Sequence, residues 1–510
     1  MAPQLPLEIW TQIALNLEDD AASLPKYARV CRLWQSVFER VIYRRLHVES
    51  EPSRTGKGVI SLSQFQSFMS GATEYRRSFL RSLHYTIATP HDIRSYEAVK
   101  LETQRYTEQN PIREANNQAF SKGIRALFEV LEAWDEQSKV TLTVTVRGRD
   151  KTLEPETKKA DDLDRCFIDW EYTVLDGEQW VIRPYHARFP DEGPDMPRIT
   201  CVKELSFENN YVFQGVWSGT AFQIAEHCVA LRSLYVDFLE WVRPDHLSYM
   251  QERRQGVSSG LAKLPSTLRS LELAFDGDEP WSNVLPALDL RFGKDFDEFS
   301  SSLRRLSVNL QELKLSVAAL ELDFLFPLNE LGAPTPEALS LYWPYLESIT
   351  LVALPMYTPS GEWLFDYNRR SEDPEELLDP STGFTILQTK FLEEEVGIFR
   401  SNMRIEHFHR LFISVGYAAQ RMPRLKMINI SFVEAPSTDL EFTSGGGVGR
   451  STGKGPTLKF ESQSGYKPDE RVAAAWGFNL DDLEVDDRGP GDLLHVVFCK
   501  VALDRFPLNQ

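Results

Sequence analysis

The feature that most restricts the fold is a short phrase, Leu-x-x-Leu-x-Leu, in which Ile, Val or Phe sometimes replaces Leu. It returns in LRSLYVDF, LRSLELAF, LQELKLSV, YLESITLVA and RLKMINISF, between residues 231 and 432. Its last part alternates as a strand with one buried face does. LSVNL and LKLSV lie too close together to be separate repeats, and we take LKLSV as the strand. We expect the alternating apolar side chains to point inward: Leu234, Val236, Leu271, Leu273, Leu313, Leu315, Ile349, Leu351, Ile428 and Ile430.

Helical patterns over residues 62–75, 120–134 and 221–229 precede strand-like runs, so a helix or loop would cover each strand. This order resembles leucine-rich repeats, in which parallel strands stack into a curved solenoid. The phrases recur at intervals of about thirty to nearly eighty residues, longer than the usual repeat of roughly 20–29 residues. The resemblance implies an α/β fold: an irregular leucine-rich-repeat-like solenoid with parallel strands and covering helices. The alternative is an α/β protein with incidental Leu-rich strands.

The first fifty residues carry a different pattern. Apolar residues four apart line one face of a helix, and Pro6 suits its first turn. Glu18-Asp19-Asp20 interrupts the pattern, and a second helical pattern follows through Tyr27 to Trp34, with Pro25 tolerable only in its first turn. A third continues from Val37 to Leu46. Helices this short bury little surface by themselves, so some apolar surface should meet the rest of the chain or a partner.

This stretch resembles an F-box: Leu5-Pro6, then Glu8-Ile9-Trp10, an acidic break, Val30-Cys31-Arg32-x-Trp34 and Tyr43-x-x-Leu46. In that family the F-box binds the Skp adaptor of SCF-type ubiquitin ligases, and through it the cullin scaffold. Pro25 departs from the family's second helix and leaves its start open. The alternative is an ordinary helical subdomain packed on its own body. The resemblance implies these adaptor-binding residues: Leu5, Pro6, Ile9, Trp10, Ile13, Leu17, Tyr27, Val30, Cys31 and Trp34.

The whole layout is similar to the substrate-receptor class of F-box proteins, and WPYLESITL, TPSGEWLF and RMPRLKMINI are similar to phrases of fungal members. We expect a three-helix F-box over 1–50, a linker over 51–59, the repeat-like body over 60–440, a flexible Gly-rich loop over 441–456 and a C-terminal cap over 457–510. Residues 147–165 and 368–383 are expected to be loops. A hairpin is expected around Asp176-Gly177, a strand at LKFES and a strand or helix at LLHVVFCKVAL.

The net charge of −19 argues against a nucleic-acid-binding surface and against attraction to an anionic membrane. Five scattered cysteines, and the lack of a spanning or secretory segment, favour an intracellular protein, cytoplasmic or nuclear. Cys31 is expected to be a core residue rather than a reactive one.

No catalytic, metal or cofactor motif stands out. The Gly-rich stretch SGGGVGRSTGKGP lacks the spacing of a phosphate-binding loop, and Gly455 stands where Ser or Thr is needed. His407 and His409 lie in a helical pattern, where a spacing of two puts them on different faces. We therefore expect no enzyme, no cofactor and no metal. The remaining enzyme alternative is an unrecognised hydrolase using a carboxylate pair.

A protein substrate, whose identity the sequence does not give, would meet the outward residues of the strands on the concave face. Tyr235 is the best anchor, because aromatic side chains contribute much of the binding energy at interfaces. A register error of one residue would invert the assignment. The alternative function is a ligase-independent scaffold. The outward residues are Ser206, Glu208, Tyr235, Asp237, Glu272, Lys314, Ser316, Thr350, Asn429 and Ser431.

Overall fold

The computed structural model describes most of the chain. The described residues are 6–17, 24–51, 58–92, 111–151, 185–190, 195–208, 214–239, 247–276, 286–367, 400–432, 438–444, 456–462, 465–487 and 495–500. Several expected features lie outside them: Leu5, residues 152–165, the hairpin around Asp176-Gly177, the acidic segment 368–383 and most of the Gly-rich stretch.

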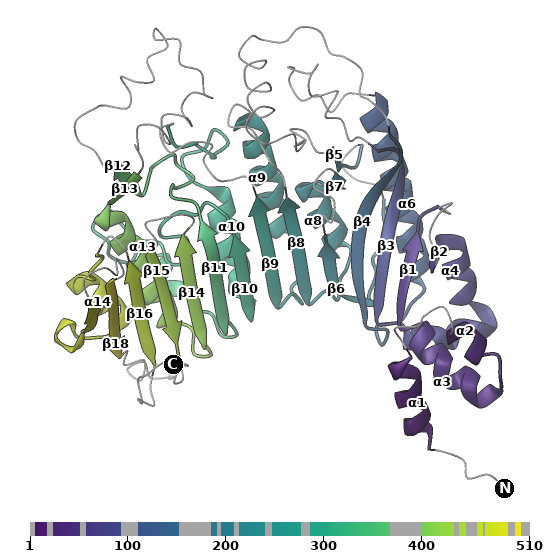
Figure 1. Cartoon of the computed structure of the whole chain (residues 1–510). Helices are drawn as coiled ribbons and strands as arrows, with labels where there is room; N and C mark the ends of the chain where they lie inside the picture. The colour runs from purple at the N-terminus through teal and green to yellow at the C-terminus, as the bar shows by residue number, and fades with distance from the viewer. Residues whose placement is uncertain are drawn as a thin grey trace, which may run out of the picture.

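The fold is a mixed α/β structure built on one large, mostly parallel sheet (Figure 1). Its strand order is β17-β18-β16-β15-β14-β11-β10-β9-β8-β6-β4-β3-β1-β2, so chain neighbours are mostly sheet neighbours. The parallel strands are β1 (Arg45–Glu49), β2 (Val59–Ser61), β3 (Ser82–Asp92), β4 (Val140–Lys151), β6 (Val202–Phe207), β8 (Ser233–Leu239), β9 (Ser270–Asp276), β10 (Glu312–Ser316), β11 (Ser348–Leu354) and β14 (Met427–Phe432).

The C-terminal end of the sheet is antiparallel. It consists of β15 (Thr438–Thr443), β16 (Thr457–Ser462), β17 (Glu484–Asp487) and β18 (His495–Lys500). Two small sheets are separate: β5 (Tyr185–Ala187) with β7 (Gln214–Val216), and β12 (Phe365–Tyr367) with β13 (Arg400–Met403).

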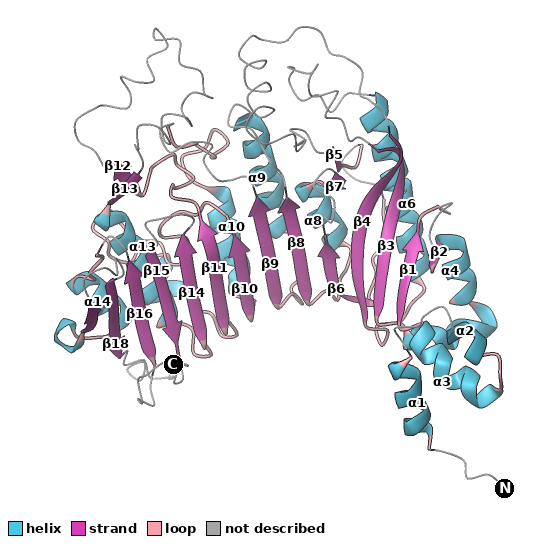
Figure 2. Cartoon of the chain, viewed as in Figure 1, coloured by secondary structure: helices cyan, strands magenta, loops and turns pink. Residues whose placement is uncertain are grey.

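Most of the described helices lie behind the sheet, whereas three hang from the end at which the chain begins (Figure 2). Those three are α1 (Leu7–Asn16), α2 (Leu24–Tyr27) and α3 (Arg32–Ile42). The others are α4 (Leu62–Phe68), α6 (Pro111–Glu132), α8 (Ser218–Glu226), α9 (Leu247–Leu261), α10 (Glu298–Ser307), α13 (Ile405–Ala419) and α14 (Glu470–Trp476), with 3₁₀ turns η2 (Gly71–Phe79), η4 (Ala338–Ser340) and η6 (Leu480–Asp482).

The predicted strand register is confirmed. The ten residues expected to point inward, from Leu234 to Ile430, are each at most 1% exposed. LKLSV forms β10, as expected. Neighbouring strands pair these residues directly, for example Leu313 with Leu271 and with Ile349. One continuous apolar layer therefore forms between the sheet and its helices.

The predicted ends of the second and third helices were wrong. The second pattern divides into the short α2 and a turn, and Trp34 belongs to α3. Pro25 does lie in the first turn of α2, as required. The third helix ends at Ile42 instead of Leu46, because residues 45–49 form β1, whose backbone pairs with β3 over its whole length.

Other corrections concern the insertions and the C-terminal end. Residues 147–151 continue β4 along β3 and are not loop. LKFES forms β16, as expected, and LLHVVFCKVAL contains β18, a strand, which is one of the two forms expected for it. Sequence analysis missed β15 and its antiparallel pairing. β15 and β16 are short and alternate polar with apolar residues, a pattern that does not specify strand direction, so the neighbouring strand decides it.

Candidate functional site

We call α1, α2 and α3 the helical module, and it has a hydrophobic core of its own. Ala14, Leu24, Val37, Phe38 and Val41 are buried together and form a cluster separate from the main core under the sheet. α1 packs against α3. Ala14 of α1 thereby joins the α3 residues of this cluster. The module is therefore a small packing unit attached to a large one.

Several residues expected to bind an adaptor support this small core instead of standing free of it. The rings of Trp10 and Trp34 lie 5.1 Å apart, and Trp34 also lies 5.5 Å from Phe38. Tyr27 completes the group, 5.4 Å from Phe38. Trp10, Ile13, Leu17, Tyr27 and Trp34 are all half-buried, so each keeps part of its surface accessible.

A second set of apolar side chains on the module faces solvent. Ile9 is 47% exposed, Val30 62% and Leu33 40%. We call these three the exposed module residues. Leu33 was missed from the sequence, although it lies inside the Val-Cys-Arg-x-Trp motif at the position written x. Large apolar side chains this exposed are unfavourable in water, so these three positions are candidates for a contact surface.

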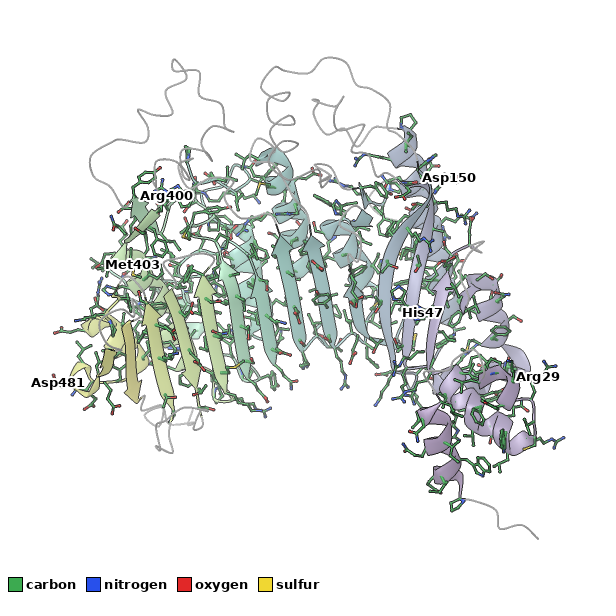
Figure 3. The ribbon with its side chains drawn as sticks, in the orientation of Figure 1. Arg29, His47, Asp150, Arg400, Met403 and Asp481 are labelled. Atoms are coloured by element: carbon green, nitrogen blue, oxygen red, sulfur yellow. The ribbon has the colours of Figure 1, made fainter. Side chains whose placement is uncertain are left out.

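Two further motif residues are exposed. Pro6 precedes the first residue of α1, and Cys31 precedes the first residue of α3. The expectation that Cys31 is a core residue was wrong: it lies in the turn between α2 and α3, where it faces outward. Arg29 lies in the same turn and is labelled in Figure 3.

A largely buried ion pair attaches the helical module to η2, the 3₁₀ turn that precedes β3. The Arg76 guanidinium lies 2.6 Å from Oε1 of Glu39, and the Tyr75 hydroxyl donates to Oε2 at 2.7 Å. Gln35 donates to Oε1 at 3.0 Å. Burial alone would raise the pKa of Glu39, but these donors hold that pKa below its usual value. The Arg76 guanidinium also lies over the Tyr43 ring, 4.6 Å from its centre.

The other candidate surface is the face of the sheet opposite its helices, which we call the open sheet face. The ten outward residues of the prediction are all half-buried, as expected for side chains on a sheet surface. Six of them align across consecutive strands: Ser206, Tyr235, Glu272, Lys314, Thr350 and Asn429.

This row extends toward the helical module through His84 and then His47, which is labelled in Figure 3. The rings of His47 and His84 stack 5.0 Å apart. Burial and the neighbouring His47 lower the pKa of His84. Lys314 and Glu272 form an ion pair in the middle of the row. The face is therefore polar and mixed in charge, and Tyr235 adds a phenol ring to it.

His407 and His409 lie in α13, as expected, and differ in their surroundings. His409 is buried beside Arg471, whose guanidinium lies 3.1 Å from Nδ1, and the Asp469 carboxylate lies 3.3 Å from the same atom. His407 is half-buried, and its pKa is lowered by burial. Among the described residues, no group of three or more His, Cys, Asp or Glu side chains is arranged to hold a metal ion.

A membrane-spanning helix is likewise not found within the described ranges, whose helices are too short or too polar to cross a bilayer. Neither a protein-family model nor a curated protein matches this sequence. The assignment of function therefore depends on the residues and geometry described above.

Proposed function

We propose that this protein is the substrate-recognition subunit of an SCF-type ubiquitin ligase. The helical module would bind the Skp adaptor, and through it the cullin scaffold. The sheet body would hold a protein target near the ubiquitin-loaded enzyme. The chain itself would catalyse no bond chemistry. Its contribution would be proximity, because holding two reactants close together accelerates their reaction.

The observation that carries this proposal is the combination of an independent core with exposed apolar side chains. A module folded only to cap the sheet would turn its apolar surface toward that sheet. Here the module has its own buried cluster and is attached through the Glu39–Arg76 pair, while Ile9, Val30 and Leu33 remain exposed. This arrangement, with the F-box-like motif, favours a protein partner.

The decisive experiment measures co-purification of the Skp adaptor with the full chain. Val30→Asp/Leu33→Asp places charges on the exposed module residues, where the fold has little reason to change because both side chains face solvent. We expect adaptor recovery to be lost. The matched control is Leu331→Asp, which charges a leucine that is 83% exposed on the sheet body. Full recovery with the double variant, or equal loss with the control, would contradict the proposal.

The proposed role of the open sheet face has a separate test. Proteins captured under proteasome inhibition are compared between the wild type and Tyr235→Ala/Asn429→Ala, two residues of the aligned row. We expect the variant to keep the adaptor and to lose one or more target proteins. If adaptor binds without cullin, or without ubiquitin appearing on any captured protein, the ligase-independent scaffold is the better interpretation.

A further inference from the structure

The N-terminal ends of the parallel strands form one edge of the sheet, the lower edge in Figure 1. Backbone hydrogen bonds link the residues at this edge from strand to strand. Arg81 donates to the Arg44 carbonyl at 2.9 Å, Arg232 to Lys203 at 2.7 Å and Arg269 to Arg232 at 2.8 Å. The ladder continues through Gln311 and Glu347 to Lys426, which donates to Glu347 at 2.8 Å.

Most of the residues joined by these backbone hydrogen bonds are basic. We call Arg44, Arg81, Lys203, Arg232, Arg269 and Lys426 the basic edge. In a chain with a net charge of −19, such a row concentrates positive charge at one place. Because each residue is fixed by its own backbone bond to the next strand, the spacing of the row is set by the strand separation of about 4.8 Å.

Several of these charges have no acidic partner within the described part of the chain. Arg44, Arg81 and Arg232 are exposed and form no ion pair with a described residue. Arg269 donates to the backbone carbonyls of Ser266, Leu268 and Asn309. By contrast, Lys203 pairs with Glu136 and Lys426 with Glu347. The uncompensated charges therefore lie mainly at the starts of β1, β3, β8 and β9.

The same edge also presents aromatic and apolar surface. Tyr345 is 41% exposed, and the guanidinium groups of Arg269 and Arg424 each lie 5.7 Å from its ring centre. Leu339 and Tyr342, six and three residues before Tyr345 in the chain, are 55% and 45% exposed. A ligand of this edge would therefore need both negative charge and apolar or aromatic groups.

We propose that the basic edge binds an extended acidic polypeptide segment that carries aromatic or aliphatic residues. From β1 to β14 the edge crosses nine strands, which at about 4.8 Å per step corresponds to roughly 38 Å, or about twelve residues of extended chain. This surface is distinct from the exposed module residues and from the open sheet face, and the inference does not depend on adaptor binding.

Charge next to the edge favours a polypeptide over a nucleic acid. Glu204 and Glu312 are exposed on the outward side of β6 and β10, near the start of those strands. A nucleic acid has a phosphate at every step and would be repelled by these carboxylates and by the net charge of the whole chain. A peptide can place uncharged residues opposite Glu204 and Glu312 and carboxylates opposite the arginines.

The test uses the full chain and a fluorescein-labelled peptide of twelve residues in which Glu alternates with Tyr. We expect this peptide to bind with an affinity that falls as NaCl is raised, because exposed charges are screened by salt. A peptide with Gln in place of Glu should bind at least about tenfold more weakly, since charge pairs at an accessible surface guide and stabilise binding.

The variant Arg44→Glu/Arg232→Glu should weaken binding of the Glu-Tyr peptide by about tenfold or more. Arg44→Gln/Arg232→Gln, which only neutralises the charges, guards against a folding defect and should give a smaller loss in the same direction. The control Lys122→Glu/Arg125→Glu makes the same change in charge on the exposed surface of α6 and should bind as the wild type does.

Three results would overturn the proposal: equal affinity for the Glu-Tyr and Gln-Tyr peptides, equal loss in the edge and α6 variants, or tighter binding of a twelve-nucleotide single strand than of the acidic peptide. The last would assign the edge to nucleic acid instead.

Discussion

The Arg76 guanidinium lies 2.6 Å from the Glu39 carboxylate, and this pair joins the helical module to the sheet body. Glu39 is in α3 and Arg76 is in η2, 37 residues later. Both side chains are largely buried. Breaking such a pair leaves the remaining charge away from water, which costs far more than loss of an exposed pair.

We predict that Glu39→Gln destabilises the helical module by about 3 kcal/mol. Because the pKa of Glu39 is lowered in the folded state, its stabilising effect is present above the carboxyl's unfolded pKa and is lost as the pH falls through the folded pKa. Hydrogen exchange at neutral pH should show faster exchange in α3, with little change in β9 and β10. Arg125→Gln, which breaks an exposed pair on α6, is the control and should leave both regions unchanged.

Packing between α8 and α9 gives a prediction with an internal control. A Cβ atom at Gly260 would lie 2.3 Å from Cβ of Phe222, so Gly260→Ala should destabilise the fold by about 1–3 kcal/mol. A Cβ atom at Gly256, one turn earlier, would be 3.5 Å from the nearest atom. Gly256→Ala should therefore be neutral or stabilising by up to about 1 kcal/mol, because alanine favours the helix. Urea unfolding of both variants checks this, and equal effects would contradict it.

The buried pair Arg254–Asp297 predicts strong coupling between two residues. Arg254 donates to both carboxylate oxygens, at 2.8 and 2.7 Å, and Asp297 also accepts from the Ser300 N–H at the start of α10. Arg254→Met should destabilise by about 3–5 kcal/mol, since it leaves the carboxylate buried without its partner. Adding Asp297→Asn should restore part of that loss. A double-mutant cycle measures the coupling, and additive effects would count against it.

Glu321 predicts the pH dependence of stability. Burial, together with Asp297 and Asp323, raises the pKa of Glu321 from 4.5 to about 7. Between these values the folded state keeps a proton that the unfolded state has released, so stability falls as the pH rises from 4.5 to 7. At pH 8, Glu321→Gln should be more stable than the wild type by up to about 3 kcal/mol.

The difference between Glu321→Gln and wild type should shrink toward zero below pH 4.5. Glu337→Gln, at an exposed carboxylate, is the control and should show no such dependence on pH. A constant difference across the range would mean that Glu321 has the same pKa in the folded and unfolded states, contrary to the prediction. Thermal unfolding at several pH values distinguishes these outcomes.

The sequence alone was sufficient for the periodic elements. Alternation in LRSLYVDF or LQELKLSV requires one buried face, so the inward side chains, Leu234 and Leu313 among them, follow from the pattern itself. The apolar spacing of α1 predicted that helix in the same way. The exposed residues Ile9 and Val30 were also among the candidates, although periodicity could not say how much of each side chain the module itself would cover.

What only the tertiary structure decided depends on contacts between distant parts of the chain. Residues 45–49 form a strand because β3 is available to pair with them. β14 is the last parallel strand of the sheet, and β15 adds to its free edge in the antiparallel direction. The Glu39–Arg76 pair and the line of basic residues at the sheet edge likewise join positions far apart in sequence. The sequence by itself determined which faces must be buried, because that follows from local periodicity. Which neighbours meet depends on the folded chain as a whole, and only the tertiary structure could decide it.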